Sequence, residues 1–267
     1  RTDKLGLAAP ALISSYTLRK VEAWFERGGL DDQLGKKSRG VSLERAYRDQ
    51  LVERVAENGH LSTALVAPNA IKKSKTVPEQ IDLMIRLGPI VIVGEVKHRL
   101  FPAESLERYN YFQNLRGAAQ QARRKADAVK MCPEIAASAL GLPIETAKQL
   151  RVLPLVVVNQ GFGLGLLVEG VRVTQSGSLA HLLGSNDLVT GMSFDVGTGE
   201  KIFNTETDYS DEADLVRRFE DILADPFVLR RFINRIEWRA FDFPQAKGGS
   251  ILIDAPELGD LGGAERG

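Results

Sequence analysis

Two apolar strands joined by a tight turn constrain the fold of this chain more than any other feature of its sequence. Apolar side chains alternate along residues 81–87, a glycine and a proline follow at 88 and 89, and a second apolar run covers Ile90–Lys97. Alternation with period two around a Gly-Pro break is typical of a β-hairpin. The sequence therefore predicts a hairpin whose strands are buried inside a sheet.

Three charged side chains interrupt this hairpin. Glu95 and Lys97 share one face at the end of the second strand, and Asp82 lies at the matching place on the first. Two carboxylates beside a lysine suit Mg²⁺, which prefers hard oxygen ligands. Such a metal would polarise a phosphoryl oxygen and help to generate hydroxide, while the lysine would orient the attacking water.

A purely structural interpretation of these residues is an alternative. An isolated Glu-x-Lys is usually an ordinary ion pair at the point where a strand leaves the core. Together with Asp82 it would then form an ion-pair network in a structural α/β protein. The matching position of Asp82 favours the metal site over this alternative.

The series Asp82, then Glu95-Val96-Lys97 after a hairpin, resembles the PD-(D/E)-x-K nuclease superfamily, which has the restriction-endonuclease-like fold. The resemblance implies that Asp82 and Glu95 bind Mg²⁺, or Mn²⁺ in its place. It also implies that the carbonyl of Val96 can act as a ligand and that Lys97 acts on the attacking water. It covers a core of residues 41–184.

The chain departs from the superfamily pattern at one position. The proline of the motif commonly stands directly before the aspartate, where this chain has Ile81. Pro78-Glu79 is a literal alternative match to the proline–acid pair. We favour Asp82 because it lies inside the apolar strand, whereas Glu79 precedes that strand.

A helix before the hairpin supplies a further candidate carboxylate. Apolar residues recur every four positions in 43–58, which predicts a helix with Ser42 as its N-cap. The resemblance implies that a glutamate on this helix completes the metal site. Glu44 in the first turn is the expected residue, with Glu53 and Glu57 as competitors.

A basic amphipathic helix is predicted over residues 111–131, with a small-residue stripe suited to close packing on a sheet. The resemblance implies a glutamine on this helix that touches DNA or the site. We favour Gln121, although a helical wheel puts Gln120 nearer the buried edge. The expected stripe consists of Phe112, Leu115, Ala119, Ala122, Ala126 and Val129.

Basic side chains near the motif are candidates for contacts with a nucleic-acid backbone. Lys72, Lys73 and Lys75 lie in a loop that leads directly into the first strand, and Arg123 and Arg124 lie on the basic helix. A second basic cluster at 36, 37 and 39 is predicted to lie in a polar loop. Solvated surface charge is the alternative for each group.

Composition limits the other chemistries. The 267 residues carry a formal net charge of zero, so any DNA-binding surface is a local patch. One cysteine, Cys132, allows no intrachain disulfide and fits a reducing compartment such as the cytoplasm. No apolar run approaches a membrane span, and no secretory pattern opens the chain. Because it begins at Arg1 without a methionine, we expect an excerpt of a longer protein.

The remaining segments predict a mixed α/β fold with a central mixed sheet flanked by helices. Strands are expected at 60–68, 152–159 and 166–173, and helices at 133–148 and 178–183. Residues 1–40 are expected to form a helical extension with a helix at 14–27. Residues 185–267 are expected to form a C-terminal appendage, mostly helical with a flexible tail, including helices at 213–223 and 226–239.

These patterns together predict a soluble Mg²⁺-dependent nuclease, a phosphodiesterase-type hydrolase acting on DNA. A homo-oligomer or a larger complex would form through the C-terminal region, and no membrane partner is expected. The alternative function is a catalytically silent nuclease-fold module that binds nucleic acid or serves in assembly.

Overall fold

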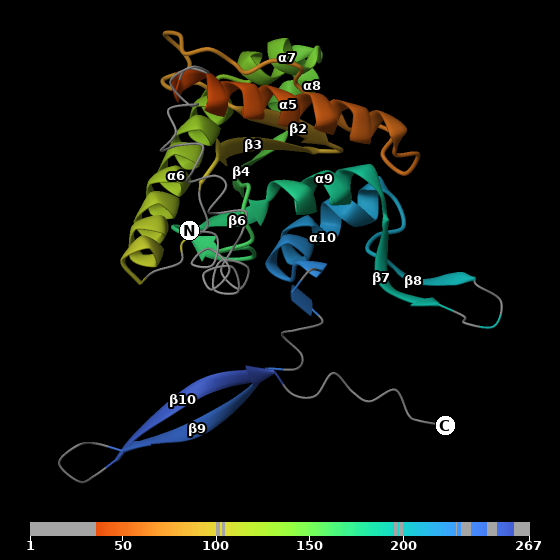
Figure 1. The fold of residues 1–267 in the computed structure, drawn as a ribbon. Helices are drawn as coiled ribbons and strands as arrows, with labels where there is room; N and C mark the ends of the chain where they lie inside the picture. Colours follow the sequence, from red (N-terminus) through yellow and green to blue (C-terminus); the bar gives the residue numbers. More distant parts are fainter. Residues whose placement is uncertain are drawn as a thin grey trace, which may run out of the picture. The chain divides into compact units, whose positions relative to one another are not determined.

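The computed structural model describes residues 36–99, 102, 105–194, 197, 200–227, 229–230, 236–244 and 250–258 (Figure 1). The helix expected at 14–27 lies outside these residues. A first compact unit extends to Ala224, and a second unit begins at Asp225. The first unit is a mixed α/β structure, as the sequence predicts.

A six-stranded mixed sheet forms the centre of the first unit, in the order β1-β2-β3-β4-β6-β5. Figure 1 labels β2, β3, β4 and β6 of this sheet. The neighbours β3, β4 and β6 are parallel, whereas β1, β2 and β5 pair antiparallel with their neighbours. The strands are β1 Leu65–Val66, β2 Leu83–Leu87, β3 Ile90–Lys97, β4 Arg151–Val158, β5 Leu167–Val168 and β6 Val171–Gln175.

The predicted hairpin is confirmed as β2 and β3. Its turn uses Gly88 at a φ of 54°, a conformation that glycine adopts at little cost. Leu83 pairs with Gly94, and a Cβ added to Gly94 would lie 3.0 Å from the Leu83 Cβ. A side chain at position 94 would therefore force Leu83 to shift.

Helices cover both faces of the sheet. One face carries α5 Lys36–Glu57, α9 Ser176–Gly184 and α10 Glu212–Ala224, whose apolar residues share one buried cluster with β2, β3 and β4. The other face carries α6 Ser105–Met131, α7 Glu134–Leu140 and α8 Ile144–Lys148. Both faces of β3 are therefore buried, which explains its continuous apolar run.

The first helix of the described chain is longer than predicted. α5 begins at Lys36, so the basic residues at 36, 37 and 39 lie in a helix and not in a loop, and Ser42 is not an N-cap. Lysine and arginine favour helices, and Gly40 costs only about 1 kcal/mol relative to alanine within one. The glycine and serine therefore do not end the helix.

Three other predicted elements and one stripe residue differ from the structure. The strand expected at 60–68 is reduced to β1, just before Pro68, which cannot donate to a sheet. Helix α6 begins at Ser105, and Phe112 is 39% exposed and not part of the buried stripe. The strand expected at 166–173 is split because Glu169 and Gly170 both have positive φ, as in a tight hairpin turn.

The chain after α9 contains two further hairpins. β7 Asp187–Phe194 pairs with β8 Lys201–Thr207, and in the second unit β9 Ile236–Pro244 pairs with β10 Ser250–Leu258. The helix expected at 226–239 is therefore wrong from Ile236 onward. The sequence IEWRA alternates apolar and charged residues, which favours a strand over a helix.

Helix α10 is tied to the hairpin by one carboxylate. The two Glu212 side-chain oxygens accept hydrogen bonds from the backbone N–H groups of Thr63 and Gly88, each at 2.7 Å. They also accept hydrogen bonds from the hydroxyls of Ser62 and Thr63. Leu215 and Phe219 of the same helix lie in the main buried cluster, so a helix beyond residue 184 belongs to the core of the first unit.

None of the helices that the structure describes is both long enough and apolar enough to span a bilayer.

Candidate active site

The hairpin brings Asp82 and Glu95 to adjacent places on one face of the sheet. Leu83 pairs with Gly94, so the next residue outward on each strand is Asp82 and Glu95 respectively. Both carboxylates are buried, with 6% and 3% of the residue exposed. Two buried carboxylates on neighbouring strands need a counter-charge.

Lys125 of α6 supplies that counter-charge. Its Nζ lies 3.1 Å from Asp82 Oδ2 and also contacts Glu95 Oε2. Only 3% of Lys125 is exposed. The two carboxylates therefore converge on one cation position, which this ammonium fills.

Lys97 contacts the second carboxylate oxygen of Glu95. The Lys97 Nζ lies 2.5 Å from Glu95 Oε1, and the lysine is partly exposed at the rim. Burial and the neighbouring charge of Asp82 raise the pKa of the Glu95 carboxyl, while hydrogen bonds from Lys125 and Lys97 act in the opposite direction. Glu95 thus has a lysine on each carboxylate oxygen.

Asp82 is held by neighbours besides Lys125. The backbone N–H of Val96 donates to its Oδ2, and the side-chain amide of Gln80 donates to its Oδ1, each at 3.3 Å. The guanidinium of Arg48, a buried residue of α5, donates to its backbone carbonyl at 2.8 Å. These contacts fix the orientation of the carboxylate.

Glu44 lies in the electrostatic field of the same site. Burial raises the pKa of its carboxyl, and the negative charges of Asp82 and Glu95 raise it further, against the opposing effects of Arg48 and Lys125. The competing residues Glu53 and Glu57 are exposed. Glu44 is therefore the glutamate of α5 whose ionisation is coupled to the two buried carboxylates.

The alternative acid Glu79 has a different environment from Asp82. Its Oε1 lies 2.6 Å from the guanidinium of Arg124, and this ion pair is partly exposed. Arg123 donates to the backbone carbonyl of Glu169. Both predicted DNA-contacting arginines are thus exposed residues that already bond to the protein.

The remaining predicted residues are more loosely associated with the carboxylates. Gln121 is partly buried and lies one helical turn before Lys125, whereas Gln120 is exposed, contrary to the helical-wheel placement. Lys72, Lys73 and Lys75 are exposed. Their loop is closed by two hydrogen bonds between Ile71 and Ile81, immediately before Asp82.

The donor set fits Mg²⁺ or Mn²⁺. In the part of the chain that the structure describes, no three Asp, Glu, His or Cys side chains gather as a metal cluster. Mg²⁺ is, however, commonly held by one or two carboxylates, with water and substrate phosphate completing its shell. Asp82 and Glu95 converge on a single cation, which is the arrangement that two such ligands require.

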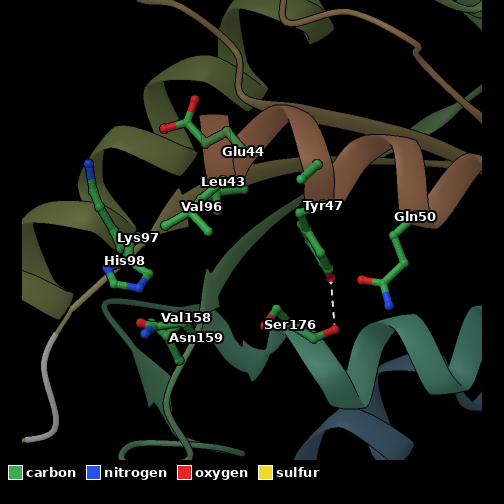
Figure 2. A pocket seen from close by; sticks show the side chains of 11 residues that line it. Leu43, Glu44, Tyr47, Gln50, Val96, Lys97, His98, Val158, Asn159 and Ser176 are labelled. Carbon is green, nitrogen blue, oxygen red and sulfur yellow. Dashed lines mark hydrogen bonds between the residues drawn. The ribbon is translucent and has the colours of Figure 1, made fainter. Parts of the chain in front are cut away.

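A pocket of about 350 Å³ opens beside Lys97. Figure 2 shows it between α5, the carboxyl ends of β3 and β4, and the start of α9, where the Tyr47 hydroxyl donates to the Ser176 carbonyl at 3.1 Å. Ligands of open α/β sheets bind at the carboxyl ends of the strands. The pocket is lined by Leu43, Glu44, Ala46, Tyr47, Gln50, Val96, Lys97, His98, Val158, Asn159 and Ser176.

Sequence reasoning missed Lys125 and Arg48 as members of the site. Both carried a signal. Lys125 follows Ala118 and Ala122 and precedes Val129 at helical spacing, so it is a charge inside an apolar stripe. Arg48 follows Glu44 by one helical turn, which is the spacing at which side chains of opposite charge interact on a helix.

Comparisons of this chain with protein-family models, curated proteins and solved structures gave no match. The resemblance to the PD-(D/E)-x-K superfamily therefore rests on the hairpin residues and stays a prediction.

Proposed function

We propose that this chain is a metal-dependent nuclease that hydrolyses phosphodiester bonds in DNA, with a restriction-endonuclease-like core. The convergence of Asp82 and Glu95 on one buried cation position carries the proposal. A lysine at the rim of the same site supports it, because phosphoryl transfer needs positive charge close to the metal.

Asp82 and Glu95 would hold the metal, together with the Val96 carbonyl and Glu44. When bound, the metal polarises a phosphoryl oxygen and lowers the pKa of a water molecule. Lys97 orients this water and donates a hydrogen bond to a non-bridging phosphate oxygen. The water oxygen then bonds to phosphorus, one P–O ester bond breaks, and the proton that the water loses is balanced by the proton that the leaving oxygen takes up, so that the products are a phosphate monoester and an alcohol.

The surroundings supply two contacts for the substrate. The lysines at 72, 73 and 75 are exposed on a loop anchored beside Asp82, which suits contacts with the phosphate backbone. The pocket beside Lys97 lies within the range of ligand-binding pockets, about 300 to 1,000 Å³. We assign it to the nucleotide next to the scissile phosphate.

Filling this pocket tests that assignment. Ala46 is an exposed lining residue, so Ala46→Trp is expected to block the pocket without disturbing the core. The KM for DNA should rise by about tenfold, the loss expected when a contact of roughly 1.4 kcal/mol is removed. Steady-state cleavage with Ala46→Ser as the control measures the change, and an unaltered KM in Ala46→Trp would remove the pocket from the substrate path.

Cleavage assays test the proposed function itself. Linear, supercoiled and single-stranded DNA are incubated with the protein and Mg²⁺ or Mn²⁺. Metal-dependent cutting is expected, with near-complete loss in Glu95→Gln and Lys97→Ala. Glu220→Gln, a change at an exposed ion pair on α10, is expected to keep full activity. Cutting that survives Glu95→Gln would reject this site.

A silent nuclease-fold module is the second candidate, and the Lys125 bridge favours it specifically. A buried ammonium already neutralises the two carboxylates, as a metal-free ion-pair network requires. This candidate predicts salt-sensitive DNA binding without cleavage and no Mn²⁺ binding at Asp82. The cleavage and metal-binding measurements therefore separate the two candidates.

A further inference from the structure

We propose that the Lys125 ammonium is an internal competitor for the metal position, which a divalent cation must displace in order to bind. The inference deepens the proposed function and rests on it, because it concerns how that site is loaded. It assigns to Lys125 a regulatory role that no sequence motif indicated.

The position of the ammonium excludes joint occupancy. Its Nζ contacts Asp82 Oδ2 and Glu95 Oε2, the two oxygens that converge on the cation position. A metal bound between these oxygens would overlap the ammonium, and two positive charges would share one buried space. Lys125 must therefore leave its place when the metal enters.

The carboxylates keep their orientation without Lys125. The Val96 N–H and the Gln80 amide hold Asp82, and Lys97 holds the other oxygen of Glu95. Backbone pairing between β2 and β3 fixes the distance between the two strands. The cation position is therefore formed by contacts that do not depend on its present occupant.

The charges of the cluster explain why displacing the Lys125 ammonium costs free energy. Two carboxylates face two lysines in this cluster, so their formal charges already cancel. Exchanging an ammonium for a dication leaves one excess positive charge in a buried site. Lys125 is flexible, with four methylene groups, so it can leave by side-chain rotation while α6 stays in place.

Metal binding to the 267-residue chain provides the first test. Mn²⁺ affinity is measured by calorimetry and by the electron paramagnetic resonance of free Mn²⁺. Lys125→Met is expected to bind Mn²⁺ at least about tenfold more tightly than the wild type, because the occupant and its repulsion are both removed. Lys97→Met is the matched control, since it removes an equal charge that also contacts Glu95. It is expected to change the affinity less.

Lysine labelling of the wild type provides a second test that needs no variant. An amine-reactive acetylating reagent is applied with and without Ca²⁺, and labelled peptides are quantified by mass spectrometry. Labelling of Lys125 is expected to rise several-fold with Ca²⁺. Lys130, an exposed lysine on the same helix, is the internal reference and should not change.

The outcomes separate the inference from the function on which it rests. If the wild type binds Mn²⁺, Asp82→Asn abolishes binding, and Lys125→Met binds no more tightly than Lys97→Met, the competitor role is rejected and the metal site stands. Ca²⁺ binding without increased Lys125 labelling also rejects it. If neither the wild type nor Lys125→Met binds Mn²⁺, the proposed metal site itself fails.

Discussion

The buried ion cluster of Asp82, Glu95 and Lys125 is the residue-level feature with the largest expected effect on stability. Each carboxylate is too deeply buried to be solvated by bulk water. Buried ion pairs contribute little net stability, yet removing one partner leaves an uncompensated charge. The cluster therefore makes the fold sensitive to single substitutions at these positions.

Lys125→Met is expected to lower the free energy of unfolding without metal by about 3 to 5 kcal/mol, the usual cost of breaking a buried pair. Urea unfolding followed by circular dichroism measures the loss. Lys130→Met, which removes an exposed pair with Asp127 on the same helix, should cost less than about 0.5 kcal/mol. Equal losses in the two variants would contradict a special role for the buried cluster.

The members of this cluster were predictable from the sequence to different extents. Period-two spacing predicts that Asp82 and Glu95 are neighbours, because the two strands of the hairpin are close in sequence and are joined by a short turn. Lys125 is thirty residues from Glu95, and a helical stripe identifies its buried face without identifying the strand residue that the face meets. Its contact is a tertiary one, which spacing alone does not encode.

At the level of elements, Glu212 holds the start of α10 against the β2–β3 turn. Burial raises the pKa of this carboxyl, but hydrogen bonds from Thr63, Gly88 and Ser62 more than offset that effect, and the pKa lies below its ordinary value of 4.5. The unfolded chain therefore binds the proton more readily than the folded one. The stability that Glu212 contributes is present above pH 4.5 and is lost as the pH falls through the lower, folded-state value.

Glu212→Gln is accordingly expected to lower the free energy of unfolding by about 2 kcal/mol at pH 7, the typical contribution of hydrogen bonds to a charged group. The difference from the wild type should shrink as the pH falls below 4.5. Urea titrations at several pH values measure both effects, with Glu220→Gln on the same helix as the control. A difference that stays constant with pH would show that the charge of Glu212 is irrelevant.

The loop closed by the Ile71–Ile81 bridge is the element expected to contact the DNA backbone. Replacing Lys72, Lys73 and Lys75 by alanine should weaken binding and reduce the slope of log affinity against log salt by about 0.9 for each lysine that contacts a phosphate. Fluorescence anisotropy over a range of salt concentrations measures the slope.

A charge-matched control makes this loop experiment specific. Alanine at the exposed lysines 130, 148 and 201 removes the same charge elsewhere in the chain. An equal reduction of the slope in both triple variants would contradict the assignment to the loop.

Element boundaries show where local patterns fail. The β2–β3 hairpin, α7, α8 and β4 follow from apolar periodicity because their neighbours in the fold agree with their local preference. In α5, by contrast, the favourable residues around Gly40 outweigh the local cost of the glycine. In β9, arginine-rich residues before Ile236 suggested a helix that pairing with β10 overrides.

At the level of the whole molecule, the described apolar clusters end at Leu223. All the proposed site residues lie in the same first unit. The mixed sheet with helices on both faces followed from the sequence because strand and helix patterns alternate along it. The order of the strands did not, since it depends on contacts between distant segments.

A chain that ends at Ala224 is therefore expected to fold, to unfold within about 3 °C of the full chain, and to keep metal-dependent cleavage. Calorimetry and the cleavage assay check this prediction. Loss of folding would show that the second unit is required by the first.

The same truncation tests assembly through the C-terminal region. A two-stranded hairpin is at best marginally stable alone in water, so β9 and β10 are expected to engage a further surface. If that surface belongs to a second copy, analytical ultracentrifugation should give the mass of two or more copies for the full chain and of one copy for the truncated one. The mass of a single copy for both chains would contradict self-association through this region.

Lys125 lies in α6, which precedes β4 in the chain, and this position has a consequence for folding during synthesis. The chain is made from its N-terminus, so Asp82, Glu95 and Lys125 leave the ribosome in that order and all before β4. The covering helix thus brings the counter-ion with it when it first docks on the nascent hairpin. Burial of the two acids therefore requires no ion from outside the chain, because Lys125 supplies their counter-charge.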